Sequence, residues 1–305
     1  MRVLFVSSGN KGKVSVLTLN QANSIKKLGI DVDFFLIQGK GIIGYLKSIP
    51  RLRKMLNSDY NIVHAHYSLS AFVASLAGAR PLVVSLMGTD VKSSYLSRKL
   101  IKVLSKIIWH NIIVKSADMR SSLGIAGVKV IPNGVDFSVF CEKEQSFCRE
   151  SLGWDENKKH ILFAANPTRP EKNFALAAEA LNRLNNSGIE LHILESVLHE
   201  QMPLWYNASD VVLLTSLWEG SPNVIKEAMA CNCPIVSTDV GDVKELIGNT
   251  EGCFISSYEP EDVASKIKKA LAFGQRTNGR NCIQHLESKQ IAKQIVSIYS
   301  SILKK

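Results

Sequence analysis

Residues 211–230 read VVLLTSLWEGSPNVIKEAMA. The short apolar run predicts a buried strand, the polar stretch after it a loop, and the apolar residues at three- and four-residue spacing a helix. Ser221 is a favourable N-cap, and Pro222 suits the first position of that helix. Free backbone amides at the start of such a helix can face an anion such as a diphosphate.

The same alternation of short apolar runs with longer periodic segments extends through the chain and predicts parallel βαβ units. The expected strands are 3–7, 32–37, 62–65, 82–86, 111–114, 128–131, 161–165, 191–194, 211–214, 234–237 and 252–255. The pattern predicts an α/β protein of two Rossmann-like, doubly wound domains facing a central cleft. We expect domains at residues 1–148 and 149–288, and a C-terminal helix at 289–305 that packs back toward the first domain.

The bulk composition agrees with two globular domains. The chain has 305 residues, of which 46% are apolar and 21% charged, and no uncharged apolar run is long enough to cross a membrane. The first apolar run is too short for the core of a signal peptide, so we expect a cytoplasmic location. The six cysteines show no metal-ligand spacing, which predicts reduced, buried thiols.

Charge is distributed unevenly. Residues 1–140 hold 19 Lys and Arg against 6 Asp and Glu, whereas the remaining residues hold 18 against 21. Basic residues cluster at 40–54 and 98–106, and the second cluster shares a predicted helix with apolar residues at helical spacing. That helix can lie peripherally on an anionic membrane, or its apolar face can pack on the sheet while its lysines are solvated. Nucleic acid is disfavoured, because no known binding motif accompanies the charge.

Two carboxylates frame the helix start at 221–224. Glu227 can accept hydrogen bonds from the vicinal hydroxyls of a ribose, and Glu219 can reach a sugar hydroxyl beyond the phosphates. The spacing E-G-x-P-x-x-x-x-E resembles the signature of the family 4 retaining glycosyltransferases of the GT-B fold. The resemblance implies that Glu219 contacts the transferred sugar and Glu227 the ribose. The donor would then be bound around this helix start, by Ser221, Pro222, Asn223 and Val224.

A second motif, residues 166–173 (NPTRPEKN), follows the first strand of the second domain. It resembles the R-x-x-K element of the family, which implies that Arg169 and Lys172 grip the donor diphosphate, with Asn166 beside it. Positioned cations suit this task, because charge builds up on the departing phosphate. Solvated surface charge is the alternative.

Further motifs lie in the first domain and at its end. The turn PNGVD at 132–136 resembles a family turn near the cleft, and Gly12 belongs to a small-residue loop that resembles the one near the donor phosphate. His66 and Asp90 follow two strands and are candidates for the acceptor side. Many relatives carry histidine where this chain has Met87, which leaves the sugar-contacting residue of this domain open.

The resemblance implies a retaining hexosyltransferase that uses a UDP- or GDP-linked sugar and needs neither a metal nor another cofactor. The basic first domain suggests a glycan or lipid-linked acceptor near an anionic membrane, as in surface polysaccharide biosynthesis. The alternative is a non-catalytic nucleotide-sugar-binding partner of another transferase. An NAD-dependent reductase is disfavoured, because neither domain opens with G-x-G-x-x-G after its first strand.

Overall fold

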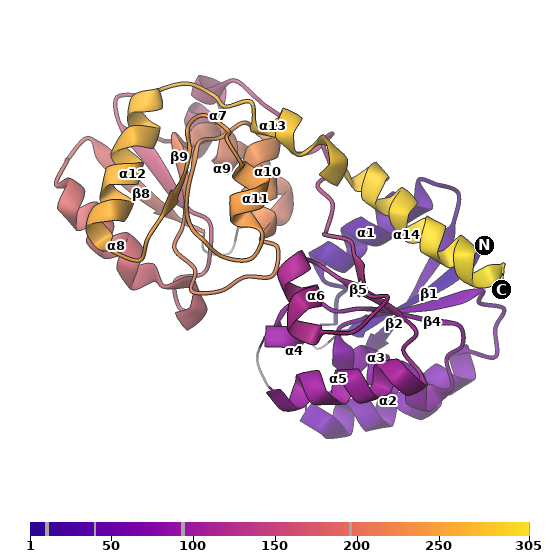
Figure 1. Cartoon of the computed structure of the whole chain (residues 1–305). Coiled ribbons are helices and arrows are strands. Elements are labelled where there is room, and N and C mark those ends of the chain that lie inside the picture. Colours follow the sequence, from indigo (N-terminus) through magenta and orange to yellow (C-terminus); the bar gives the residue numbers. More distant parts are fainter. Residues whose placement is uncertain (10–11, 40, 93–94, 195–196, 305) are drawn as a thin grey trace. The chain divides into compact units, whose positions relative to one another are not determined.

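The computed structural model describes residues 1–9, 12–39, 41–92, 95–194 and 197–304 (Figure 1). The chain divides into two compact units. The first comprises residues 1–134 together with 288–305, and the second comprises residues 135–287. Both are α/β units built on parallel sheets, as the sequence predicts.

The first unit has a parallel sheet of strand order β2-β1-β3-β4-β5-β6. Its strands are β1 (Arg2–Ser8), β2 (Asp31–Ile37), β3 (Ile62–His66), β4 (Leu82–Ser85), β5 (Asn111–Val114) and β6 (Lys129–Val130). Its helices are α1 (Val16–Lys26), α2 (Gly41–Met55), α3 (Ser68–Ala77), α4 (Thr89–Lys92), α5 (Tyr95–Ile107), α6 (Ala117–Leu123) and α14 (Ser288–Leu303). The strand order reverses between β1 and β3, so the crevice of this unit lies beyond the carboxyl ends of those two strands.

The C-terminal helix α14 is an integral part of the first unit. It runs alongside α1 (Figure 1). Ile291, Ile295 and Tyr299, on one of its faces, are buried. The hydroxyl of Tyr299 lies 2.5 Å from Nδ1 of the buried His64 in β3, and the other ring nitrogen of His64 lies 2.8 Å from the hydroxyl of Ser85. The last helix of the chain is therefore tied by a buried hydrogen-bonded chain to the centre of the first sheet.

The second unit has a parallel sheet of strand order β11-β10-β9-β7-β8. Its strands are β7 (Lys159–Phe163), β8 (Ile189–Ile193), β9 (Val211–Leu214), β10 (Ile235–Thr238) and β11 (Cys253–Ser256). Its helices are α7 (Gln145–Leu152), α8 (Phe174–Leu184), α9 (Met202–Ala208), α10 (Asn223–Ala230), α11 (Val243–Ile247), α12 (Pro260–Phe273) and α13 (Gly279–Cys282), with short 3-10 turns at Pro170–Lys172, His199–Gln201 and Gln284–Leu286. Here the order reverses between β7 and β9, which places the crevice at the loops that follow them.

The division between the units comes earlier in the chain than the expected 148/149. Residues 135–148 belong to the second unit because their side chains and helix α7 pack there. Arg149 of α7 donates to the carbonyl of Ala208 at 3.0 Å and pairs with Asp210 at 2.8 Å. Both partners of this buried guanidinium belong to the second unit, so their interactions fix α7 to that unit.

The thiols are free, as expected, but their burial varies. Cys148, Cys231 and Cys233 are buried, Cys141 and Cys253 are half-buried, and Cys282 is exposed. The expectation that all six are buried is therefore wrong for three of them, because α13 and the ends of neighbouring segments lie at the surface of the second unit.

Candidate active site

The loop after β7 carries three of the predicted site residues. The side-chain oxygen of Asn166 accepts hydrogen bonds from the amide and the hydroxyl of Thr168, at 2.9 and 2.7 Å. This local turn leads the chain into the 3-10 turn Pro170–Lys172, which Asn173 ends in a left-handed conformation (φ 51°). Asn166 therefore shapes the loop that presents Arg169 and Lys172.

Lys172 and Glu219 join the loops that flank the reversal of strand order. The Nζ of Lys172 lies 2.5 Å from Oε1 of Glu219, and both side chains are mostly buried. The hydroxyl of Ser216 donates to the same carboxylate oxygen at 2.9 Å. The hydroxyl of Thr215 donates to the carbonyl of Lys172 at 3.1 Å, which fixes the backbone of one loop on the other. The two residues that the sequence placed at the diphosphate and at the sugar thus form one ion pair.

Arg169 is directed elsewhere. Its guanidinium is half exposed and pairs with Glu171, with Nε 2.7 Å from Oε1. The structure therefore brings Lys172 to Glu219 and Arg169 to Glu171, and it does not bring both cations onto one group. Because Arg169 is exposed and its pair is local, the side chain has room to turn toward an anion at the crevice.

Helix α10 begins one residue later than expected. Pro222 (φ −71°, ψ 121°) occupies the cap position, Asn223 is the first helical residue, and no side chain among the described residues caps this end. The hydroxyl of Ser221 instead donates to Oδ2 of Asp242 at 2.6 Å. The prediction of Ser221 as N-cap is thus wrong: Pro222 occupies the cap position, and the hydroxyl of Ser221 is directed to Asp242, after β10. The first amides of α10, from Asn223 and Val224 onward, still point out of the helix without a side-chain cap.

Glu227 is held by two partners that the sequence analysis missed. Its Oε1 lies 2.8 Å from Nε2 of His199, and its Oε2 accepts a hydrogen bond from the hydroxyl of Tyr206 at 2.9 Å. The hydrogen bond to Glu227 raises the pKa of His199, and burial raises the pKa of Tyr206 well above its ordinary value. Each carboxylate oxygen keeps a further lone pair, so Glu227 is oriented and can still accept hydrogen bonds.

Asp242 is a third missed residue. It follows β10 at the same edge of the sheet, its Oδ2 receives the Ser221 hydroxyl, and its buried Oδ1 has no hydrogen-bond partner among the described residues. Burial raises the pKa of Asp242, and the nearby ammonium of Lys226 opposes this. Gly241 lies beside it with φ 62°, and a Cβ there would come within 2.8 Å of the carbonyl oxygen of Gly220. Only glycine allows the two loops to approach this closely.

In the first unit, His66 and Asp90 are both buried at the carboxyl edge of the sheet. The Asp90 carboxylate accepts hydrogen bonds from the backbone amides of Gly88 at 3.0 Å, Met87 at 3.1 Å and Ser68 at 3.2 Å. These bonds tie together the loops after β3 and β4. Burial raises the pKa of Asp90. Tyr67, between His66 and Ser68, has φ 80°, a strained conformation of the kind that gathers at functional sites.

His66 is enclosed by aromatic rings, stacked on His64 at 4.4 Å and tilted on Phe5 at 4.5 Å between ring centres. Neither of its ring nitrogens has a hydrogen-bond partner among the residues that the structure describes. Burial, with a smaller effect of Lys115, lowers the pKa of His66 to about 3. Acceptor contact by His66 or Asp90 stays a prediction, which their burial does not favour.

Gly12 lies in a tight turn, with φ 72° and its amide 2.7 Å from the carbonyl of Gly9. Residues 10 and 11 of this loop lie outside the described residues. Apart from the two chain neighbours of Gly12, no heavy atom of the described residues comes within 4 Å of the position of a Cβ on this glycine. The positive φ, rather than crowding, is thus the local reason for glycine at this position.

Two family models match the chain. The model described as Glycosyltransferase Family 4 matches residues 10–139, and the model described as Glycosyl transferases group 1 matches residues 177–272. Together they span well over half of the 305 residues. The chain belongs to the family 4 glycosyltransferases.

Curated relatives of this family 4 chain act in the synthesis of several glycans. It is 25% identical over 237 residues to a putative teichuronic acid biosynthesis glycosyltransferase of Bacillus subtilis, covering 68% of this chain and 61% of the relative. It is 26% identical over 273 residues to the UDP-Gal:α-D-GlcNAc-diphosphoundecaprenol α-1,3-galactosyltransferase of Escherichia coli, covering 74% and 70%. The match spans about three fifths of the length of the first of these relatives.

Solved structures show that this family 4 chain has the GT-B fold. Sucrose-phosphate synthase from Thermosynechococcus elongatus superimposes with a TM-score of 0.83 at 15% identity, covering 100% of this chain and 99% of the other. Anabaena HepE, solved with UDP and glucose, gives a TM-score of 0.75 at 20% identity, covering 99% and 100%. The fold expected from the sequence is thereby confirmed.

The missed residues had weak sequence signals. His199 and Tyr206 lie in the segment between β8 and β9, and isolated residues in an irregular segment carry no spacing pattern. Asp242 could have been found from its place, since it follows a predicted strand near the reversal of strand order. Its role with Ser221 depends on a contact between loops that spacing does not reveal.

Proposed function

We propose that this chain transfers a hexosyl unit from a UDP- or GDP-linked sugar to a lipid-linked or membrane-proximal glycan acceptor, with retention of configuration. The observation that carries the proposal is the ion pair of Lys172 and Glu219, which joins the loops after β7 and β9 at the carboxyl edge of the second sheet. The loop of Glu219 leads directly into the uncapped start of α10, the helix that carries Glu227. Ligands of open parallel sheets bind at this edge, where the strand order reverses.

The donor diphosphate fits the positive groups of this edge. The free amides at the start of α10 and the ammonium of Lys172 favour an anion, and Arg169 is exposed on the same loop. Departure of a nucleoside diphosphate increases the charge on its phosphate, so these groups stabilise the transition state more than the ground state. In the proposed reaction they replace a metal ion, and Arg169, Lys172 and Glu219 are the catalytic residues.

The nucleoside end fits Glu227. A ribose offers two neighbouring hydroxyl donors, and the Glu227 carboxylate is fixed in place by His199 and Tyr206 with acceptor capacity left over. Glu219 would orient the sugar, with Ser216 holding its carboxylate. Anabaena HepE, of the same fold, is solved with UDP and glucose, which supports this class of donor.

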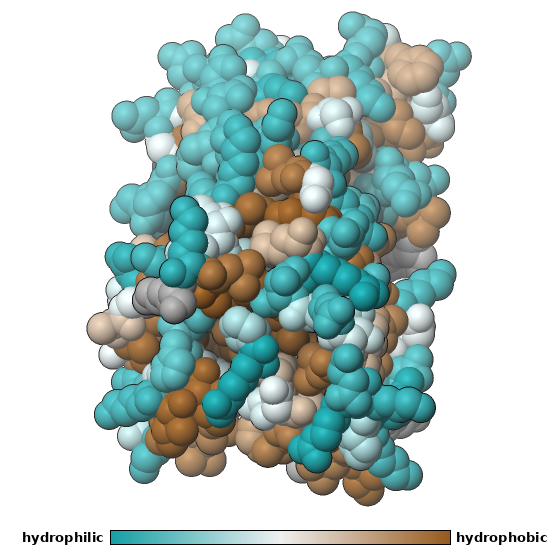
Figure 2. All heavy atoms as spheres, turned by 90° about the vertical axis from the view of Figure 1, so that its right-hand side faces the viewer, coloured by the Kyte–Doolittle hydropathy of each residue, from teal (hydrophilic) through white to brown (hydrophobic). Residues whose placement is uncertain are grey.

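The acceptor part of the proposal is supported by the surface of the first unit. Leu96, Leu100, Val103 and Ile107 of α5 are exposed, whereas Ile101 is buried and Leu104 packs against the core of the first unit. One side of this helix therefore packs inward, as in the alternative, while another side leaves apolar side chains at the surface. Figure 2 shows hydrophobic side chains interspersed with hydrophilic ones on one face of the molecule. No helix of the described residues is long and apolar enough to span a bilayer.

An apolar cavity of about 400 Å³ lies between α2, α3 and α5 of the same unit. Its walls include Tyr45, Leu69, Phe72, Leu100 and Trp109. Its apolar lining suits the hydrocarbon tail of a lipid-linked acceptor, and the basic residues of α2 and α5 suit the anionic surface in which such a lipid resides. A relative from Escherichia coli acts on a diphosphoundecaprenol-linked sugar, which agrees with this acceptor class.

The proposal is tested first by calorimetry of the full chain against UDP, GDP, ADP and CMP, without added metal and with EDTA. One nucleoside diphosphate should bind selectively, and the substitution Glu227→Gln should lower the affinity for it. The matching nucleotide sugar is then supplied with lipid-linked acceptors in vesicles, and the anomeric configuration of the product is read by NMR. Binding without transfer to any acceptor would favour the non-catalytic partner, whereas an inverted product would exclude retention.

A further inference from the structure

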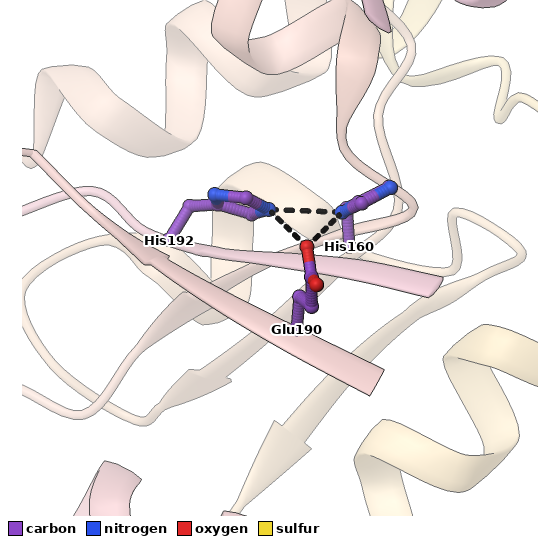
Figure 3. Close-up of side chains that lie close together, drawn as sticks. All are labelled: His160, Glu190 and His192. Carbon is purple, nitrogen blue, oxygen red and sulfur yellow. Dashed lines mark hydrogen bonds and ion pairs between the residues drawn. The ribbon is translucent and has the colours of Figure 1, made fainter. Parts of the chain in front are cut away.

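Three side chains with metal-binding atoms converge in the second unit, away from the candidate active site. They are His160 of β7 and Glu190 and His192 of β8, which point toward one another in Figure 3. His160 pairs with Glu190 in the register of the two strands, and His192 is two residues further along on the same face. The cluster therefore bridges β7 and the edge strand β8.

The distances between the three ligand atoms match the size of a small divalent cation. His160 Nδ1 lies 2.8 Å from His192 Nε2, and Oε2 of Glu190 lies 3.8 Å from the first and 3.9 Å from the second. A point equidistant from these three atoms is about 2.1 Å from each, within the usual range of zinc–nitrogen and zinc–oxygen bonds, about 2.0–2.2 Å. Such an ion would take the place of the proton that the two imidazoles share.

Neighbouring groups orient each ligand. Nε2 of the buried His160 lies 2.8 Å from the carbonyl of Asp155, which can only accept, so Nε2 carries the hydrogen and Nδ1 presents its lone pair to the cluster. A backbone carbonyl on the outer nitrogen is the usual support of a metal-binding histidine. Oε1 of Glu190 pairs with Lys158, which leaves Oε2 facing the histidines.

The remaining ligand is held by stacking. The ring of His192 lies flat against Trp154, with centroids 3.5 Å apart and planes at 9°, and Trp205 meets Trp154 edge-on. His192 and Glu190 are partly exposed, which gives an ion and a water ligand a way in.

We propose that His160, Glu190 and His192 bind one divalent cation of the zinc class, with water in the fourth position. A site of two imidazoles and one carboxylate favours the binding of Zn²⁺ over that of Mg²⁺ or Ca²⁺. His160 and Glu190 are the second residues of their strands, at the amino edge of the sheet, whereas the donor-binding residues follow the carboxyl ends. The ion therefore clamps the edge strand to β7 and takes no part in sugar transfer.

The test is calorimetric titration of the EDTA-treated full chain with Zn²⁺ alone. We expect one ion per chain, and at least about a 100-fold weaker affinity for His192→Gln and for Glu190→Gln. His285→Gln, an exposed histidine of the same unit, and Glu219→Gln, at the donor site, should leave the affinity unchanged. At about a 100-fold excess over the dissociation constant, Zn²⁺ should raise the melting temperature by about 5 °C or more.

Co²⁺ supplies a readout of geometry. The wild-type chain should show the visible absorption of four-coordinate Co²⁺, and both ligand variants should lose it while keeping the wild-type circular dichroism. Absence of Zn²⁺ binding, or binding that both substitutions leave intact, would overturn the proposal and reduce the cluster to a hydrogen-bonded histidine pair. Because nucleotide binding is measured separately, failure here leaves the proposed transferase function standing.

Discussion

The ammonium of Lys172 lies 2.5 Å from the carboxylate of Glu219, so the loops after β7 and β9 are joined by an ion pair at the place proposed for the donor. The pair is mostly buried, and Ser216 donates a further hydrogen bond to the same oxygen. A donor diphosphate would compete with Glu219 for Lys172, and this competition separates the effects of the two residues.

Substitution of Glu219 should separate binding from transfer. In Glu219→Gln, Lys172 is released to the diphosphate, so the nucleoside diphosphate should bind about as tightly or up to about fivefold more tightly, while kcat falls about 100-fold. Lys172→Met should weaken both binding and kcat. Calorimetry and initial rates measure the two quantities, with the exposed Lys268→Met as control. Equal kcat in Glu219→Gln and wild type would remove Glu219 from the chemistry.

Glu227→Gln should lower the affinity for the nucleoside diphosphate by about tenfold or more, because hydrogen bonds to a charged acceptor are worth about 1.5–3 kcal/mol. Tyr206→Phe should cause a smaller loss, since it leaves Glu227 present but less firmly oriented. If Glu227 binds ribose, the 2′,3′-dideoxynucleotide should bind the wild type and Glu227→Gln equally. A full Glu227 effect on that analogue would place the contact elsewhere.

The pair of His199 and Glu227 predicts a pH dependence of stability. Glu227 raises the pKa of His199 in the folded chain above its ordinary value of 6.5. The folded state then holds a proton that the unfolded state loses, so this contribution is complete below pH 6.5 and is lost as pH rises through the raised pKa. Urea unfolding from pH 6 to 8.5 should show this loss in the wild type, and His199→Gln should abolish it.

His66 predicts the opposite dependence in acid. Its pKa is lowered to about 3, mainly by burial, so between pH 6.5 and 3 the unfolded chain binds a proton that the folded chain does not. Stability must fall as pH decreases through this range, by about 1.4 kcal/mol per pH unit for one such group. His66→Leu should reduce the slope by this amount, as measured by urea unfolding between pH 6 and 4, while the buried His64, whose pKa is also lowered, keeps its own contribution. Unchanged transfer at pH 7 in His66→Leu would exclude an acceptor contact.

Much of the fold could be predicted because it depends on local pattern. The run at 211–214 and the periodic stretch after it yielded β9 and α10, and all the expected strands are present, although β6 is only Lys129–Val130. The start of α10 was misjudged by one residue, and the hydrogen bond of Ser221 to Asp242, distant in sequence, could not be read from the local pattern. The role of His199 could not be predicted either, since only the folded chain brings this residue to Glu227.

Tyr299→Phe should destabilise the first unit by about 1–3 kcal/mol, because it leaves Nδ1 of the buried His64 without the hydroxyl that lies against it. Ile295→Ala, in the buried face of the same helix, should cost about 2–5 kcal/mol through loss of packing. Fluorescence-detected urea unfolding gives both values. Ser301→Ala, an exposed neighbour, serves as control, and wild-type stability in both core variants would show that α14 is dispensable.

Because α14 completes the first unit although it follows the second unit in the chain, the first unit can be completed only after the second has been synthesised. Domains usually fold as units while the chain is being made, the N-terminal one first. Here residues 135–287 have emerged from the ribosome before residues 288–305 are available to cover α1 and reach His64. The apolar surface of the first half that α14 covers therefore stays exposed until this helix has been translated.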